Sequence, residues 1–305
     1  MATAACKLED RFSLMRNREV NQPAKVGAVG VPVVTSALPG SEEQVLSALS
    51  SDSLTNVIMS GFIRDNGLVN PFNRGRFYVC RDENNKLEGV ALLGHTILFE
   101  AFSDRAIEAF AMLARRESST HLLMGEHNAV ERFWSYYTRS DQSPRLVCPI
   151  VFLEGTGPFT KQPVVSGLRP AIREDLEHVV RAQAAMALET SGVDPLEKDP
   201  EGFGKRYLRR IEKQRVWVLI EEDRLLFKAD VLADTPEANY IEGVYVTPEE
   251  RGKGLGRRCL ATLGQRLLDR TKRIYLFVEN DDARTKSFYL KLGFRVAGQY
   301  DLLYF

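Results

Sequence analysis

The stretch VTPEERGKGLGRR, residues 246–258, places three glycines inside a run of charged residues, directly after an apolar segment and directly before a helical one. A loop that joins a strand to a helix N-terminus can bind a phosphate group through exposed backbone N–H groups and the positive end of the helix dipole. Glycines allow the backbone to approach such a ligand closely. The stretch therefore predicts an anion-binding loop, and the spacing of its glycines indicates which anion.

Two familiar phosphate loops do not fit this spacing. A Walker A loop needs Gly-Lys followed by Ser or Thr, whereas Lys253 is followed by Gly254. A dinucleotide-binding fingerprint needs G-x-G-x-x-G, whereas Gly252, Gly254 and Gly256 give G-x-G-x-G. What remains is the pattern Arg-x-x-Gly-x-Gly, which begins at Arg251.

A second signature lies downstream, in LFVENDDARTKSFYLKLGF at residues 276–294. It begins with a strand that ends near Asn280, followed by Ala283. An aromatic pair, Phe288 and Tyr289, and a Gly-Phe step, Gly293 and Phe294, complete it. Together with the glycine loop, these residues resemble the GNAT superfamily of acyl-CoA-dependent N-acetyltransferases. The resemblance lies in residues over roughly 215–300 and in the order of elements over 164–305; for the first half it is topological.

The resemblance implies acetyl-CoA as co-substrate, with its pyrophosphate on the loop amides and positive charge supplied by Arg251 and Lys253. The pantetheine arm would lie between two splayed parallel strands, 242–246 and 274–279, and the amide of Tyr245 or Val246 would polarise the thioester carbonyl. The residues implied in cofactor binding are Val244, Tyr245, Val246, Arg251, Gly252, Lys253, Gly254, Leu255, Gly256 and Asn280.

The resemblance also implies chemistry: an acetyl or other short acyl group passes to a primary amine by direct attack in a ternary complex. Tyr289 stands where the family's general acid stands, and a phenol suits protonation of the CoA thiolate. Strand alternation would put Tyr240, Glu242, Val244 and Val246 on one face unless a bulge intervenes, which makes Glu242 the candidate base. Two alternatives stay open: a non-catalytic acyl-CoA sensor, and a scaffold that binds no CoA.

Composition and residue spacing limit the other partners that the protein is expected to bind. Lys+Arg and Asp+Glu number 41 each, so the charge gives no reason to expect a nucleic acid or a membrane as partner. The four cysteines, at 6, 80, 148 and 259, have no metal-type spacing, and we expect no metal and a reduced, cytoplasmic protein. His121 and His127 have no companion at ligand spacing either. The expected partner is a small-molecule or peptide amine, whose site we expect residues 189–205 to shape; a homodimer is left open.

A length of 305 residues suggests two domains, and the seam falls in the Ser-, Gly- and Pro-rich part of 138–163. We therefore predict domains 1–155 and 164–305. In each, a hairpin precedes a strand–helix–strand–helix–strand series, which indicates a duplicated α/β (α+β) fold: tandem GNAT-like domains, each with a mixed, mostly antiparallel sheet flanked by helices. The first domain has FEAFSDRAIEAF at 99–110, without a glycine loop, and we expect it to keep the fold without the cofactor chemistry.

The chain also carries local signals that the fold tests. Ser41 and Ser103 are expected helix N-caps, and the segment 76–94 is an expected hairpin around DENNK. The apolar segment 56–63 has no clear assignment. A short strand is expected at 165–171, and the C-terminus reads as two strands, 294–299 and 301–305.

Overall fold

The computed structural model describes residues 33–50, 53–116, 120–138 and 143–305. They divide into two compact units. The first unit contains the described residues up to 150 together with 299–305, and the second unit contains 151–298. The predicted domains 1–155 and 164–305 stay a prediction, and the units differ from them where the C-terminal segment joins the first unit. Residues 1–32, with Cys6, lie outside the described residues.

Each unit combines strands with helices in the same order, so the duplicated fold is confirmed. The first unit contains β1 (Val33–Ser36), α2 (Glu42–Ala48), α3 (Leu54–Asn66), the 3-10 helix η1 (Pro71–Asn73), β2 (Gly75–Arg81), β3 (Leu87–Gly94), β4 (Thr96–Ala101), α4 (Asp104–Ala114), β5 (Leu122–Glu126), α5 (His127–Tyr137) and the start of β6 (Leu146–Gly155). The second contains β7 (Arg169–Pro170), η2 (Arg173–Asp175), α6 (Leu176–Ser191), α7 (Pro195–Lys198), α8 (Pro200–Glu212), β8 (Val216–Glu221), β9 (Arg224–Asp234), β10 (Asn239–Val246), η3 (Pro248–Glu250), α9 (Leu255–Leu268), β11 (Ile274–Glu279), α10 (Ala283–Leu292) and the start of β12 (Arg295–Tyr304).

The sheets are mixed and mostly antiparallel, as predicted. The strand order is β1-β2-β3-β4-β5-β12-β6 in the first unit and β12-β6-β11-β10-β9-β8-β7 in the second. The pairs β4–β5 and β10–β11 are parallel, whereas β2–β3, β8–β9 and β9–β10 are antiparallel. Both β6 and β12 supply one end to each unit, so each sheet is completed by a strand end from the other half of the sequence.

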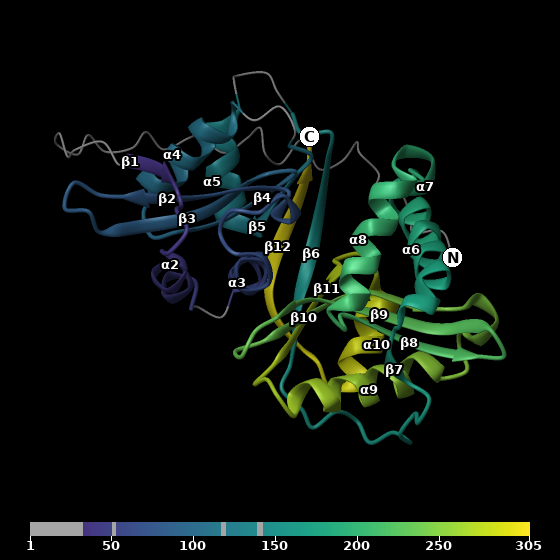
Figure 1. The fold of residues 1–305 in the computed structure, drawn as a ribbon. Helices are drawn as coiled ribbons and strands as arrows, with labels where there is room; N and C mark the ends of the chain where they lie inside the picture. Colours follow the sequence, from purple (N-terminus) through teal and green to yellow (C-terminus); the bar gives the residue numbers. More distant parts are fainter. Residues whose placement is uncertain (1–32, 51–52, 117–119, 139–142) are drawn as a thin grey trace. The chain divides into compact units, whose positions relative to one another are not determined.

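In the second unit, helices cover both faces of the sheet (Figure 1): α6 and α8 lie on one face, and α9 and α10 lie on the other. Strand β8 shows why, because Val216 and Val218 pack toward α6 and α8 while Trp217 and Leu219 belong to the core under α9 and α10. Successive side chains of a strand point to opposite faces, so an apolar run of this kind needs cover on both sides.

Local signals explain most element boundaries. Ser103 Oγ accepts from the backbone N–H of Ala106 at 3.2 Å and starts α4, as predicted. The expected hairpin is β2–β3, and its turn is fixed by Asp82, whose Oδ1 accepts from the amides of Asn84 and Lys86. Ser41 is the N-cap residue of α2, but its hydroxyl donates to Leu38 O and does not cap the helix.

Three expectations are corrected or completed. The unassigned segment 56–63 is part of α3, which is buried along most of its length. The expected strand 165–171 shortens to β7, with two residues. The two strands expected at the C-terminus form a single strand, β12, which runs without a break through Gln299. Pairing of residues 300–304 with β5 extends this strand to Tyr304.

The pairing of β12 with β5 places Leu303, two residues from the end of the sequence, in the core of the first unit, where it is 4% exposed beside Phe110 and Phe133. We expect Leu303→Ala to destabilise this unit by about 2–4 kcal/mol, since a buried leucine is lost. Hydrogen exchange should show faster exchange in β4 and β5. Val296→Ala is the control, because Val296 of the same strand is 50% exposed; equal effects of the two variants would contradict the assignment.

Candidate active site

Two parallel strands separate at the centre of the second unit. Strands β10 and β11 pair only at Asn239–Ile274 and Tyr240–Tyr275. Beyond Tyr240, no strand in the described part of the chain pairs with the edge of β10 that faces β11, so backbone groups of this edge are available to a ligand. The two strands are thus splayed, as the sequence resemblance implies.

A bulge at Gly243 accompanies this separation. On β10, Glu242 lies opposite Asp230 and Tyr245 lies opposite Lys228, so one extra residue of β10 is accommodated between them. Gly243 has φ +59°, and a Cβ there would lie 3.0 Å from Asp230 Oδ2 and from Lys228 Nζ. A side chain at this position would be strained and tightly packed, so the bulge favours glycine.

The bulge changes which side chains of β10 share a face. Val244 and Val246 pack against the core that contains Ile241, under α9 and α10. Glu242 points instead to the face of α6 and α8, where it contacts Arg210. The expectation that Glu242, Val244 and Val246 lie on one face is therefore wrong, because simple alternation holds only in a strand without a bulge.

The glycine loop follows β10 and leads into α9. Gly252 and Gly254 both have φ +82°, and a Cβ at either would meet nothing within 4 Å. Gly254 is the N-cap residue of α9, and no side chain caps the helix. A Cβ at Gly256 would lie 2.9 Å from Val246 Cγ2, so this glycine allows the helix to pack against β10. The start of α9 therefore combines amides that no side chain caps with open space at Gly252 and Gly254.

Three basic residues surround the loop. Arg251 turns back to β10, where its Nε donates to Val246 O at 2.9 Å and its guanidinium lies over the ring of Tyr245. Lys253 Nζ pairs with Glu250 at 3.0 Å. Arg257, in the first turn of α9, has a buried Nε without a hydrogen-bond partner among the described residues. An orphaned guanidinium N–H and uncapped amides fit an anionic group such as a diphosphate.

The first unit has the same pair of separating strands but a different helix start. Strands β4 and β5 pair only at Thr96–Leu122 and Ile97–Leu123. Helix α4, however, is capped by Ser103 and has Asp104 in its first turn. A capped helix end next to a carboxylate is less suited to an anion than the uncapped start of α9. The absence of cofactor chemistry in this half stays a prediction.

Tyr289 of α10 reaches the core beside the separated strands. It is 7% exposed, and its ring lies edge-on to Phe288 and Phe294. Burial, with the charge of Asp282, raises its pKa above the ordinary value of 10.0, so the phenol keeps its proton at neutral pH. Burial raises the pKa of Tyr240 well above its ordinary value of 10.0, and Tyr289 adds to that shift.

The remaining predicted site residues are Asn280 and Leu255. Asn280, just after β11, is exposed, and its Nδ2 donates to Asp281 Oδ1 at 3.2 Å. Leu255 is 6% exposed and packs in the core at the start of α9. Cys259 is fully buried and burial raises its pKa to about 12, so it carries no reactive thiolate.

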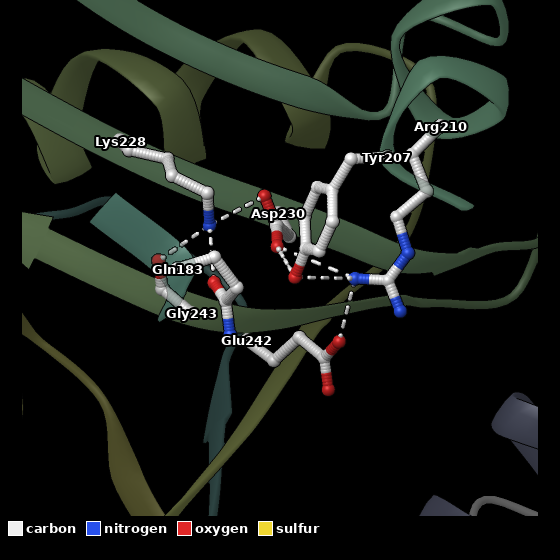
Figure 2. Close-up of polar contacts among 7 residues, drawn as sticks. All are labelled: Gln183, Tyr207, Arg210, Lys228, Asp230, Glu242 and Gly243. Carbon is white, nitrogen blue, oxygen red and sulfur yellow. Dashed lines mark hydrogen bonds and ion pairs between the residues drawn. The ribbon is translucent and has the colours of Figure 1, made fainter. Parts of the chain in front are cut away.

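A buried polar cluster lies on the α6 and α8 side of β10 (Figure 2), and the sequence prediction missed most of it. Its centre is Lys228, which is 0% exposed. Lys228 Nζ pairs with Asp230 Oδ1 at 2.8 Å and donates to Gln183 Oε1 at 2.8 Å and to Gly243 O at 3.2 Å. Burial lowers the pKa of Lys228, and Asp230 opposes this shift.

The cluster extends to the surface through α8. Tyr207 donates to Asp230 Oδ2 at 3.3 Å, and Arg210 donates to the same oxygen at 3.3 Å and to Glu242 Oε1 at 3.0 Å. Burial and Asp230 raise the pKa of Tyr207 well above 10.0. The sequence held one signal for this cluster: Lys228 and Asp230 are charged residues at alternate positions of the stretch 225–233, which is otherwise apolar.

Two further classes of site were searched for within the described ranges. No group of three or more His, Cys, Asp or Glu side chains there is placed to hold a metal ion. Of the helices formed by the described residues, none has the length and apolar character needed to cross a membrane.

Comparisons with known proteins agree with this geometry. The sequence profile of the acetyltransferase (GNAT) family matches residues 191–294. A Drosophila protein of known structure has TM-score 0.65 and 10% identity, over 89% of this chain and 98% of its own. An acetyltransferase of the GNAT family from Colwellia psychrerythraea has TM-score 0.57 and 11% identity, over 90% and 99%. A tandem GNAT protein from the clavulanic acid biosynthesis pathway has TM-score 0.53 and 13% identity, over 90% and 98%. No curated protein sequence matches the chain.

The buried ion pair gives a stability prediction. We expect Lys228→Met to destabilise the second unit by about 3–5 kcal/mol, because it removes a buried partner of Asp230, which is 1% exposed. The double variant Lys228→Met/Asp230→Leu should recover a large part of that loss, since it also removes the buried carboxylate that Lys228→Met leaves with Arg210 as its cationic partner. Urea denaturation measures both. A double variant no more stable than Lys228→Met would show that the charge of Asp230 is not the cause.

Proposed function

We propose that the second unit, whose residues 191–294 match the acetyltransferase (GNAT) family model within a tandem GNAT-like fold, transfers an acetyl or short acyl group from acetyl-CoA to a primary amine. Transfer is by direct attack in a ternary complex. The main support for the proposal is the geometry at the end of β10. There the strand is no longer paired with β11, and the helix that follows the loop, α9, has no side-chain cap.

In this proposal the loop holds the pyrophosphate of acetyl-CoA. The amides of 251–256 bind it, the charges of Arg251 and Lys253 lie nearby, and Asn280 contacts the arm of the co-substrate. The free edge of β10 at Val244, Tyr245 and Val246 receives the pantetheine and polarises the thioester carbonyl. Acetyl-CoA supplies the activated acyl group. Open space at Gly252 and Gly254 and the orphaned Nε of Arg257 support this assignment.

Tyr289 is the proposed proton donor. As the new C–N bond forms and the C–S bond breaks, the sulfur gains a proton and the amine nitrogen loses one. A phenol whose pKa is raised by burial keeps its proton until a stronger base develops beside it. The protonated state of Tyr289 therefore supports its role as the general acid.

Glu242 is the proposed base for the amine. Arg210 Nη1 binds one of its oxygens, Oε1, at 3.0 Å, and Oε2 has no partner among the described residues. The Glu242 side chain is 31% exposed. A partly exposed carboxylate oxygen of this kind is able to receive an ammonium proton, directly or through water.

We also propose a cellular compartment for the enzyme. Within the described ranges, Cys80 and Cys259 are free thiols. Free thiols are typical of a reducing compartment, which supports the expectation of a cytoplasmic enzyme.

The loop assignment predicts a binding defect. Gly254→Ala should weaken acetyl-CoA binding by about tenfold or more, equivalent to ~1.4 kcal/mol, because the variant strains the loop and adds a methyl group where the ligand approaches. Isothermal titration calorimetry measures it. Gly67→Ala is the matched control: Gly67 also has positive φ, +75°, and open space, but it lies in the first unit. No binding of acetyl-CoA by the wild type would end the proposal.

The acid assignment predicts a kinetic defect. Tyr289→Phe should lower kcat by about 10²-fold with an unchanged acetyl-CoA Kd, because only the proton donor is lost. In the wild type, kcat should show no decline from Tyr289 ionisation between pH 7 and 10, since the pKa of Tyr289 is raised above 10.0. Tyr275→Phe, at a buried tyrosine that packs on Phe152, is the control. Tight binding without turnover of any amine, and no effect of Tyr289→Phe, would favour the sensor.

A further inference from the structure

The exposed end of the buried cluster has one guanidinium edge that the protein does not use. Arg210 makes its polar contacts, to Tyr207, Asp230 and Glu242, through Nη1 (Figure 2). Its Nε and Nη2 have no hydrogen-bond partner among the residues that the structure describes. The side chain is 28% exposed. Neither Nε nor Nη2 is among the buried atoms that lack a hydrogen-bond partner, so both atoms of this edge are accessible to a ligand.

That edge is held in place before any ligand arrives. The Arg210 guanidinium lies 5.1 Å from the ring centroid of Tyr207, and Tyr207 is 5% exposed. Asp230, which anchors Nη1, is itself fixed by Lys228. A guanidinium already ordered by its neighbours loses little conformational entropy on binding, and Nε with Nη2 presents two parallel donors that match the two oxygens of a carboxylate.

A complementary group lies beside it. Glu242 uses Oε1 for Arg210 and leaves Oε2 without a partner in the described part of the chain. The two side chains are joined by a 3.0 Å contact, so the unused donors and the unused acceptor are neighbours. One molecule that carries both an ammonium and a carboxylate can reach both of them.

Resting on the proposed transfer reaction, we propose that the acceptor is an amino acid. Its carboxylate binds Nε and Nη2 of Arg210, and its amine lies at Glu242, which removes the proton. Arg210 is then the residue that determines acceptor class.

Charge balance favours this class of acceptor over others. Lys228 and Arg210 are balanced by Asp230 and Glu242. A zwitterionic amino acid adds no net charge to this partly buried cluster. A polyamine adds positive charge next to Arg210, and a simple alkylamine leaves the guanidinium edge without a partner, which costs binding free energy.

The test uses acceptors in matched pairs, each an amino acid and its carboxamide, assayed with acetyl-CoA and the full-length protein. The carboxamide has the more readily deprotonated amine, so intrinsic reactivity favours it. We expect the wild type to prefer the carboxylate instead, by ~10-fold or more in kcat/KM, because a site built for a charged group rejects the analogue that lacks it.

Variants assign the preference to Arg210. Arg210→Met should reduce the acid-to-amide ratio to about one, and Arg210→Lys, which keeps the charge but loses the two parallel donors, should give an intermediate ratio. Arg206→Met is the control on the same helix, since Arg206 pairs with Asp199 at the surface, and its ratio should stay at the wild-type value. Acetyl-CoA binding by calorimetry shows that each variant is folded.

The outcomes separate this inference from the reaction it rests on. Equal turnover of acids and amides by the wild type, or a preference that survives Arg210→Lys unchanged, overturns the inference and leaves the transfer reaction standing. Acetyl-CoA binding without acetylation of any amine overturns the transfer reaction itself. If Arg210→Met does not fold, the wild-type ratio and Arg210→Lys still decide.

Discussion

The bulge at Gly243 is the constraint on which the rest of the second unit depends, and a buried ammonium holds it. Lys228 is fully buried, and it offsets the cost of burial with three oxygen partners, one of which is the carbonyl of Gly243. Glycine favours this shape, because Gly243 has a positive φ and a Cβ there would lie 3.0 Å from Lys228 Nζ and from Asp230 Oδ2. The bulge directs Val246 into the core and Glu242 to the opposite face.

Because of this bulge, the proposed acid and the proposed base lie on different sides of the separated strands. Tyr289 approaches from the side of α10, and Glu242 with Arg210 lies on the side of α8. Tyr240 connects the two electrostatically: its own burial, followed by Glu242 and opposed by Arg210, raises its pKa, and Tyr289 adds to the shift. The proposed proton donor, Tyr289, and the proposed acceptor, Glu242, thus lie on different sides, which suits a reaction in which one group loses a proton and another gains one.

The two units show that this fold does not by itself create a binding site. Both have a parallel pair that separates after two residue pairs. In the first unit the following helix satisfies its own amides with Ser103, whereas in the second unit α9 begins at Gly254 with no side-chain cap. The difference between the units therefore lies in a few residues at one helix end, since unpaired helix amides attract an anion and capped ones do not.

The sequence by itself determined the elements that depend on neighbours along the chain: the glycine loop, the capped α4, the hairpin around Asp82, and the mixed sheets that the repeated order of elements predicts. It failed where a decision needed partners distant in sequence. Alternation put Glu242 beside Val246, and only the pairing with β9 showed the bulge. Arg210, Lys228 and Gln183 come from three separate elements, so their meeting is a property of packing. Local conformational preferences fix loops and caps, whereas the desolvation of a charge, and the partners that this requires, exist only once the chain has folded.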